Sequence, residues 1–189
     1  MSLVSTLLTT LLAALAVLLL ADLVSGVVHW GEDTFFTEAT PIVGPAVIAP
    51  NVEHHERPAA FLAKSYWESN RQLLLVAAGL VGAAALLGLL TWHVGLFAAV
   101  VGNANQIHKW AHMPRRRVPA PVRWAQRVGV LQSVRHHARH HGGARNTAYC
   151  TVTDWLNPLL DRIGLWRGLE RVTVPILGAP RRADLAGSR

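Results

Sequence analysis

Four histidines occur in one short run near the C-terminal end of the chain, at His136, His137, His140 and His141. Arg135 and Arg139 flank this run, so the rings would repel one another if all were protonated, whereas neutral imidazole is a metal ligand. On a helix, residues four apart share one face, so the run presents two adjacent pairs of imidazoles that can serve two metal ions. The alternatives are a solvated turn rich in histidine and arginine, or a histidine tract that binds metal loosely.

Two other segments carry ligand types at the same spacing. His108 and His112 form an i, i+4 pair, which aims two imidazoles at one centre. His29 and Asp33 form a second pair at the end of an apolar segment. Ionisable residues are expensive in such a segment, so this pair either binds one metal or packs helices together.

Two further features accompany these pairs. His54 and His55 are adjacent and lie among acidic residues that would orient the imidazoles, although a His-His pair alone is a weak signal. Asp22 precedes His29 by about 10 Å along a helix axis, which is too far for direct contact. We therefore expect Asp22 to hydrogen-bond a metal ligand on another helix.

Three apolar segments must position these residues. They are Leu3–Val28, Asn70–Leu90 and the slightly short Val94–Ile107. The first is long enough to cross a hydrocarbon core about 30 Å thick, and it lacks the basic start of a signal peptide, which is the rival interpretation. The second and third form a predicted helical hairpin joined at Trp92 and His93, where amphipathic rings suit a membrane interface.

The charge distribution predicts how these spans are oriented. No lysine or arginine precedes Arg57, and most basic residues follow Lys109, so the net charge of +7 belongs to the C-terminal half. Such an excess marks the cytoplasmic side of a membrane protein. With the N-terminus outside, three spans bring every candidate ligand to the cytoplasmic side, and His93 alone lies opposite. We interpret His93 as interfacial and not as a ligand. Nucleic-acid binding is disfavoured because aromatic platforms are not interleaved with the basic residues.

The predicted fold is an all-α integral membrane protein with about three transmembrane helices, a histidine-rich helical cap on the cytoplasmic side and an amphipathic C-terminal segment. The Pro-rich stretch Thr34–Pro58 is predicted to be a loop, Met113–Gln126 a connector whose arginines face solvent and lipid phosphates, and Trp155–Leu177 an amphipathic helix. We divide the chain into a first transmembrane helix (1–30), a loop with the His-His pair (31–69), a transmembrane hairpin (70–112), a cytoplasmic cap (113–175) and a tail (176–189).

The ligand count indicates a dinuclear site. Nine histidines, all except His93, together with Asp33 exceed what one tetrahedral zinc needs. Imidazole does not by itself identify the metal. A metal pair at the cytoplasmic face of apolar helices suits O₂-dependent attack on an unactivated C–H bond of a lipid tail, which favours iron, while hydrolysis of a lipid ester by zinc stays open. Cys150 is the single cysteine, which excludes an internal disulfide and any multi-cysteine metal site.

Several separate motifs resemble the Kua family. This lipid desaturase domain is shared by plasmanylethanolamine desaturases, including the bacterial carotenogenesis protein CarF, and by plant fatty acid desaturase 4. The resemblance spans roughly residues 20–162 in family order. The motifs are Asp22–Thr34, Glu53–His55, Asn105–His112, His136–His141, Tyr149-Cys150 and Asn157–Asp161.

The resemblance implies an oxidoreductase of lipid metabolism with a di-iron site that uses O₂ and two electrons from a separate ferredoxin- or cytochrome b5-type donor. In the plasmanylethanolamine branch, a 1-O-alkyl ether phospholipid becomes a vinyl ether, as in plasmalogen biosynthesis. The implied metal ligands are His29, Asp33, His54, His55, His108, His112, His136, His137, His140 and His141. The residues implied to support these ligands or to pack around them are Asp22, Asn70, Asn105, Gln106, Tyr149, Asp154 and Asn157.

Two other functions remain open. The same di-iron site could desaturate or hydroxylate the acyl chain of a phospholipid, or the chain could be a non-catalytic metal-binding membrane protein. The segment after His141 is small and basic where the family pattern is more acidic or aromatic, which leaves the lipid headgroup undetermined.

Overall fold

The computed structural model describes residues 2–142 and 146–177, and within these ranges the chain is helical or irregular and contains no strand. The expected all-α class is therefore confirmed. The helices are α1 (Leu3–Phe35), the π-helical η1 (Gly44–Ile48), α2 (Ala49–Glu56), α3 (Pro58–Ala63), α4 (Tyr66–Leu86), α5 (Trp92–Gly102), α6 (Ala104–His112), the 3₁₀ turn η2 (Arg115–Arg117), α7 (Ala120–Arg127), α8 (Val134–His141), α9 (Leu156–Arg162) and α10 (Leu165–Leu177).

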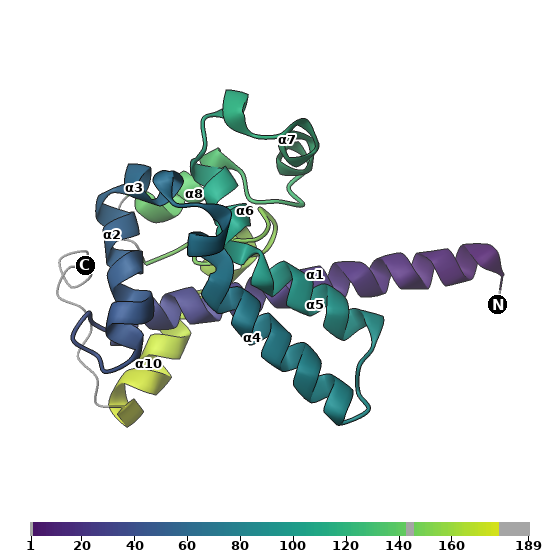
Figure 1. Ribbon diagram of the computed structural model, residues 1–189, viewed down its shortest axis with the longest axis horizontal. Coiled ribbons are helices and arrows are strands. Elements are labelled where there is room, and N and C mark those ends of the chain that lie inside the picture. The colour runs from purple at the N-terminus through teal and green to yellow at the C-terminus, as the bar shows by residue number, and fades with distance from the viewer. Residues whose placement is uncertain (1, 143–145, 178–189) are drawn as a thin grey trace.

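In the described ranges, α1 and α4 are the two helices long and apolar enough to cross a membrane. The 33 residues of α1 extend about 50 Å, and its N-terminal half projects away from the other helices (Figure 1). Leu3 and Leu11 on this half are 76% and 67% exposed, as expected of side chains that contact lipid. Ser65 and Glu68 form a capping box that starts α4.

The third predicted span is divided into two short helices. α5 has 11 residues, about 16 Å, and α6 follows it after a break at Asn103. The Asn103 side chain donates to the carbonyl of Ala99 and accepts from the hydroxyl of Tyr66, and such side-chain bonds compete with the helix. α4 and α5 pack side by side as the predicted hairpin (Figure 1).

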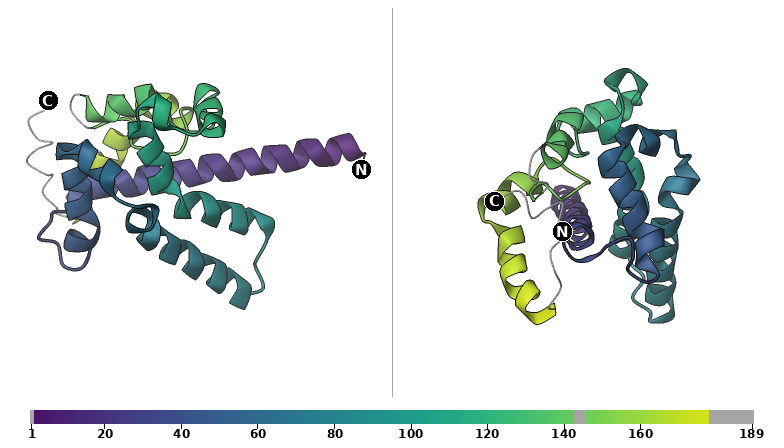
Figure 2. Two further views of the ribbon diagram at one scale, coloured as in Figure 1. Left: turned by 45° about the horizontal axis from the view of Figure 1, so that its top comes forward. Right: turned by 90° about the vertical axis from the view of Figure 1, so that its left-hand side faces the viewer.

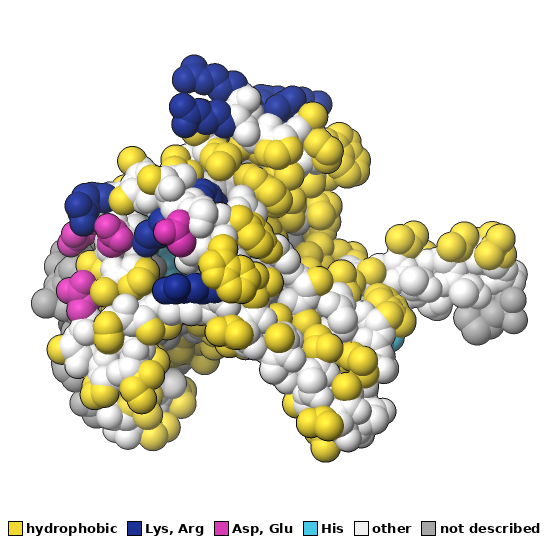
Figure 3. All heavy atoms as spheres, viewed as in Figure 1, with side chains coloured by type: hydrophobic (Ala, Val, Ile, Leu, Met, Phe, Trp, Pro, Cys, Tyr) yellow, Lys and Arg dark blue, Asp and Glu magenta, His cyan; other side chains and the backbone are white. Residues whose placement is uncertain are grey.

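The histidine-bearing helices α2, α6 and α8 gather around the C-terminal half of α1, far from its N-terminus (Figures 1 and 2). Seen end-on, α1 lies between α10 on one side and α2 with α4 on the other (Figure 2). The lysines and arginines visible in Figure 3 lie on the histidine-bearing end, whereas the projecting half of α1 and the outer part of the α4–α5 hairpin show none. Basic and apolar regions are thus separated in space as well as in sequence.

The C-terminal half of α1 packs against the extended segment that follows α8. Trp30, Tyr149, Cys150, Leu160 and Trp166 form the buried core at this contact. The approach is closest at a glycine of α1, which faces the Cys150 side chain and the Trp166 ring. A small residue at this position lets the two backbones meet.

Replacement of Gly26 by alanine is expected to lower the free energy of unfolding by about 1–3 kcal/mol, because the new Cβ would lie 2.6 Å from Cys150 Sγ and 3.0 Å from the Trp166 ring. Gly31→Ala on the same helix is the control, since its Cβ would meet nothing within 4 Å. Thermal unfolding in detergent checks both variants. Equal melting temperatures for the two would contradict the close contact.

Four segments differ from the sequence prediction. Residues 34–58, predicted to be a loop, contain η1 and α2, because Pro45 and Pro50 occupy first-turn positions, where proline favours a helix start. The predicted connector contains η2 and α7. The predicted amphipathic helix is divided into α9 and α10 at Gly164, whose φ is 67°. The predicted tail begins inside α10, and residues 178–189 lie outside the described ranges.

Candidate metal centre

Five histidines from three helices form the first candidate metal site, which we call the five-histidine group. α2 supplies His54, α6 supplies His108 and His112, and α8 supplies His137 and His141. Their Nε2 atoms form a closed ring in which successive contacts measure 3.1 Å (His54 to His141), 2.9 Å (His141 to His137), 2.9 Å (His137 to His108), 3.3 Å (His108 to His112) and 3.2 Å (His112 to His54).

Hydrogen bonds between neutral imidazoles cannot satisfy this ring. Each Nε2 either carries a proton or presents a lone pair, and donors cannot alternate with acceptors around a ring of five. A central cation would instead accept all five lone pairs. Two nitrogens bound at right angles to a metal at about 2.1 Å lie about 3.0 Å apart, close to the observed contacts. The donor set therefore fits a metal ion.

The second candidate site, the three-histidine carboxylate group, consists of His29 and Asp33 from α1, His55 from α2 and His140 from α8. All four are buried. Asp33 Oδ2 lies 3.7 Å from His29 Nε2 and 3.5 Å from His140 Nε2, while Asp33 Oδ1 lies 3.6 Å from His55 Nε2. These distances are too long for the hydrogen bonds that protonated rings would make to the carboxylate.

Two backbone carbonyls fix the tautomers in this group. His29 Nδ1 donates to the Tyr149 carbonyl at 3.1 Å, and His140 Nδ1 donates to the Thr147 carbonyl at 2.9 Å. A carbonyl can only accept, so both protons are on Nδ1 and both Nε2 lone pairs face the Asp33 carboxylate. Among the described residues, His29 Nε2, His140 Nε2 and Asp33 Oδ2 are buried without a hydrogen-bond partner. Converging lone pairs and a carboxylate repel unless a cation lies between them, so this donor set also fits a metal.

The two groups lie against each other. The ring centroids of His55 and His141 are 4.9 Å apart, and those of His29 and His108 are 6.2 Å apart. α8 contributes to both groups, because His137 and His141 face one and His140 faces the other. The expected meeting of the α6 pair with the 136–141 run is observed. Two metal ions bound here would be neighbours.

Burial keeps the five-histidine group in the form that binds metal. Burial, reinforced by the neighbouring imidazoles, lowers the pKa of His54, His108 and His137 far below the usual range. The same causes lower the pKa of His112 to about 4 and that of His141 to about 2. These rings are therefore neutral at physiological pH, which leaves their lone pairs available.

His136 and His93 lie outside both groups. His136 is one turn before His140, where its Nε2 accepts from the Asn157 side chain at 3.1 Å and its Nδ1 lies 3.8 Å from Asp154. It thereby fastens α8 to the segment after Cys150 and lies apart from the converging nitrogens. His93 is exposed and stacks on Trp92 at the far end of the hairpin, with ring centroids 3.8 Å apart.

The other predicted supporting residues mainly hold the ligand-bearing helices. Asn70 Oδ1 accepts from the Gln106 backbone N–H at 3.0 Å, and Asn105 donates to the Ser69 carbonyl at 2.7 Å, so both tie α6 to α4. Gln106 takes part here through its backbone. The Asp154 carboxylate accepts from the Ser133 N–H at the start of α8.

Asp22 does not hydrogen-bond a metal ligand, which corrects our expectation. Its carboxylate accepts from the Val152 N–H at 2.8 Å and from the Thr153 hydroxyl at 2.6 Å. The extended segment beside α1 presents a backbone donor that has no ladder partner, and Asp22 satisfies it. Asp22 therefore holds this segment, including the carbonyl of Tyr149, against α1. The Tyr149 ring itself packs edge-on against His29.

Sequence reasoning missed Asn51 as a supporting residue. Its side-chain amide donates to Asp33 Oδ1 at 2.7 Å. Asn51 precedes His55 by one helical turn, a signal that becomes visible only once residues 49–56 are known to be helical. The buried Gln132, also missed, donates to the Cys150 carbonyl at 2.7 Å.

Replacement of Asn51 by alanine is expected to weaken metal binding at the three-histidine carboxylate group by about 10–100-fold, because Asp33 loses the donor that orients it. Chelator competition against the metal-loaded protein measures this loss. Glu56→Ala, at an exposed position of the same helix, should leave metal affinity unchanged. Equal metal affinities in the two variants would show that Asn51 does not support the metal site.

Comparisons with known proteins identify the family of this chain. Residues 18–184 match the lipid desaturase domain family. Plasmanylethanolamine desaturase 1 of Mus musculus is 36% identical, covering 92% of this chain and 68% of the relative. Plasmanylethanolamine desaturase of Myxococcus xanthus is 32% identical (88% and 62%), and fatty acid desaturase 4 of Arabidopsis thaliana is 33% identical (91% and 54%).

The chain thus spans between 54% and 68% of the length of these three relatives. No solved structure matches it. The family match covers most of the chain, and several separate relatives carry desaturase names. The chain therefore belongs to the lipid desaturase family, a family of oxidoreductases.

Proposed function

We propose that this protein is a membrane-bound, di-iron, O₂-dependent lipid desaturase that converts a 1-O-alkyl phospholipid to its vinyl ether. The observation that carries the proposal is the contact between two buried metal-ligand groups at the C-terminal end of the apolar helix α1. Family membership supports desaturation, and the name of the 36% identical mouse relative supports an ether phospholipid as substrate.

The proposed reaction balances with a separate reductant. Two hydrogens leave adjacent carbons of the alkyl chain, and together with O₂, two electrons and two protons they form two molecules of water. When bound, the iron pair supplies the O₂ chemistry that removes these hydrogens. The electrons come from a ferredoxin- or cytochrome b5-type donor.

The protein's own residues position the groups that react. The Tyr149 and Thr147 carbonyls hold the rings of His29 and His140, and Asn51 holds the Asp33 carboxylate. Holding a methylene pair beside a fixed oxidant turns a random encounter into an oriented one, which is the main contribution expected of the chain.

An apolar pocket at the ligand-bearing end of α1 suits the alkyl chain. Its volume is about 460 Å³, and it lies between α1, η1 and α10. Val27, Trp30 and Phe35 contribute apolar walls from α1, and Ile48 contributes one from η1. Trp30 and Glu32 in the pocket wall are the sequence neighbours of His29 and Asp33, so the pocket adjoins the turns of α1 that carry these proposed ligands.

We further propose that the histidine-rich end faces the cytoplasm. The basic residues of the C-terminal half support this orientation, because lysine and arginine accumulate on that side of membrane proteins. The electron donor would then approach from the cytoplasm, and no nucleic-acid partner is proposed.

Desaturation of a phospholipid acyl chain is the second candidate function. It is favoured by the 33% identical fatty acid desaturase 4 of Arabidopsis thaliana. The same ligand groups would serve this reaction, and the two candidates differ in which chain of the lipid occupies the apolar pocket.

Lipid mass spectrometry combined with elemental analysis tests the proposal. Cells that make ether phospholipids but lack vinyl ethers are compared with and without the protein under oxygen, and iron is measured in the purified protein. Acid-labile vinyl ethers and two irons per chain are expected. New acyl double bonds would support the second candidate, whereas bound metal with unchanged lipids would leave a non-catalytic metal-binding protein.

A further inference from the structure

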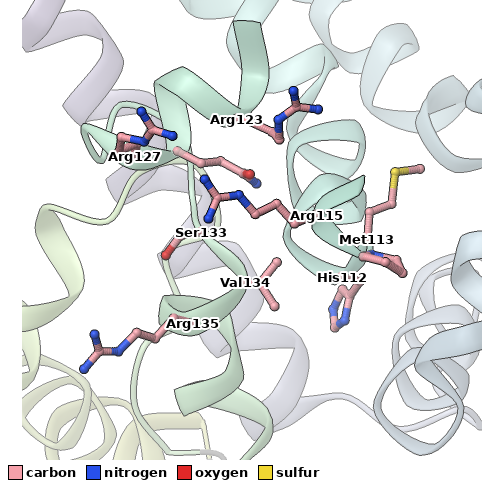
Figure 4. Close-up of a pocket in the computed structure, with 10 residues that line it drawn as sticks. His112, Met113, Arg115, Arg123, Arg127, Ser133, Val134 and Arg135 are labelled. Atoms are coloured by element: carbon pink, nitrogen blue, oxygen red, sulfur yellow. The ribbon is translucent and has the colours of Figure 1, made fainter. Parts of the chain in front are cut away.

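A second pocket adjoins the five-histidine group on the side of η2, α7 and α8. Its volume is about 470 Å³ (Figure 4). Arg115 extends across it from η2 towards Ser133 at the start of α8 (Figure 4). Arg123 and Arg127 from α7 and Arg135 from α8 also line it.

The positive charge of this pocket has no protein counter-charge. Across the described ranges, none of the four arginines forms an ion pair with a carboxylate, and no acidic residue lines the pocket. Arg123 is partly immobilised because it donates to the Val118 carbonyl at 2.6 Å. Arg115 crosses the pocket, whereas Arg123, Arg127 and Arg135 point in different directions (Figure 4). The planar fork of an arginine side chain matches the oxygens of a phosphate. An anion bound here would supply the missing counter-charge.

The pocket is connected to the proposed metal centre through one side chain. His112 lines the pocket and also contributes its Nε2 to the five-histidine group. An anionic group held by the arginines would therefore lie one imidazole away from a metal ligand. A solvated basic surface that only marks the cytoplasmic side would not need this connection.

We propose that this pocket binds the phosphodiester of the substrate phospholipid and thereby fixes which carbons reach the metal centre. The proposal rests on the function proposed above. In an ether phospholipid, only a few bonds separate the phosphate from the first two carbons of the alkyl chain. A phosphate subsite bordering a metal ligand thus selects carbons next to the glycerol, whereas desaturation in the middle of a chain would require a headgroup site much farther away.

The subsite is tested by lipid binding, which does not require turnover. The purified, metal-loaded protein in a nonionic detergent is mixed with 1-O-alkyl-2-acyl-glycerophosphoethanolamine, and retained lipid is counted by native mass spectrometry. Arg115→Gln and Arg127→Gln are each expected to weaken binding by about 10-fold or more, because each removes a charged hydrogen-bond donor. Arg117→Gln is the matched control, since it removes the same charge from the same turn outside the pocket.

Two further arms identify the source of the anion. The neutral 1-O-alkyl-2-acylglycerol, which lacks the phosphate, should bind equally to the parent protein and to all three variants. Inorganic phosphate should compete only weakly with the phospholipid, because it lacks the lipid chains.

Several results would overturn the subsite. Arg117→Gln could lose as much phospholipid binding as the pocket variants, or the pocket variants could lose neutral-lipid binding in parallel. Inorganic phosphate could bind tightly without competing with the phospholipid, or the variants could change only the affinity for an acidic electron donor. Normal vinyl-ether formation by Arg115→Gln would reject the subsite while leaving the proposed function intact. Phosphate-dependent lipid binding without any lipid product would support the subsite and contradict the proposed function.

Discussion

Replacement of His137 by alanine is expected to abolish vinyl-ether formation, with a loss of at least about 100-fold, and to remove one metal ion per chain. His137 is buried, and its Nε2 contacts His108 and His141 at 2.9 Å each. Its removal therefore opens the ring of five nitrogens at its most crowded point. Lipid mass spectrometry and elemental analysis of the same preparation give the two readouts.

Two histidines outside both groups serve as controls for this experiment. His93→Ala, at the far end of the hairpin, should change neither readout. His136→Ala should lower thermal stability through loss of its bond to Asn157 while both metals remain bound. If the alanine variant at position 137 does not fold, His137→Gln keeps the volume and still lacks the imidazole. Full metal content and activity in both 137 variants would disprove the five-histidine group as a metal site.

Replacement of Asp33 by asparagine is expected to reduce vinyl-ether formation about as much as the His137 variant does. Metal should be lost selectively from the three-histidine carboxylate group. Asp33 contributes the single negative charge that faces His29, His55 and His140. Asparagine has almost the same shape and can still accept from Asn51, so the change removes charge with little change in volume. Activity should fall by at least about 100-fold, and one metal ion per chain should remain in the five-histidine group.

Spectroscopy distinguishes this outcome from general damage. A protein that keeps one metal should show the signature of an isolated ion and no sign of magnetic coupling between two. Glu38→Gln, which neutralises an exposed carboxylate shortly after α1, is the control and should retain a coupled pair. A coupled pair in Asp33→Asn would show that the carboxylate is not needed at the site.

The helical class and the sorting of histidines to one end could be predicted from the sequence because both depend on local patterns. Apolar length indicated α1 and α4, and the i, i+4 spacing placed His108 with His112 on one face. The charge bias placed the basic residues at the same end as the histidines. Each of these features depends on the sequence of a single segment and not on its contacts with other segments.

The features that were missed depend on tertiary contacts. Asp22 was expected to support a ligand, but the backbone donor that it satisfies lies 130 residues away in the chain. Asn51 was overlooked because the prolines around it were interpreted as loop signals. His136 has the same spacing from His140 as His108 has from His112, and only the position of Asn157 shows that it faces elsewhere. Spacing gives the residues that share a helix face, but not the neighbour of that face.

The distribution of the ligands over α1, α2, α6 and α8 has a consequence for how the protein matures. The first ligands of both groups emerge from the ribosome with residues 29–55, whereas α8, which completes both groups, follows about 80 residues later. Loading of the centre must therefore wait until the C-terminal half has been synthesised and has docked beside α1. A chain truncated before α8 would insert its apolar helices yet retain no complete site. In cells starved of metal, the newly made protein would lack the stabilisation that bound metal provides.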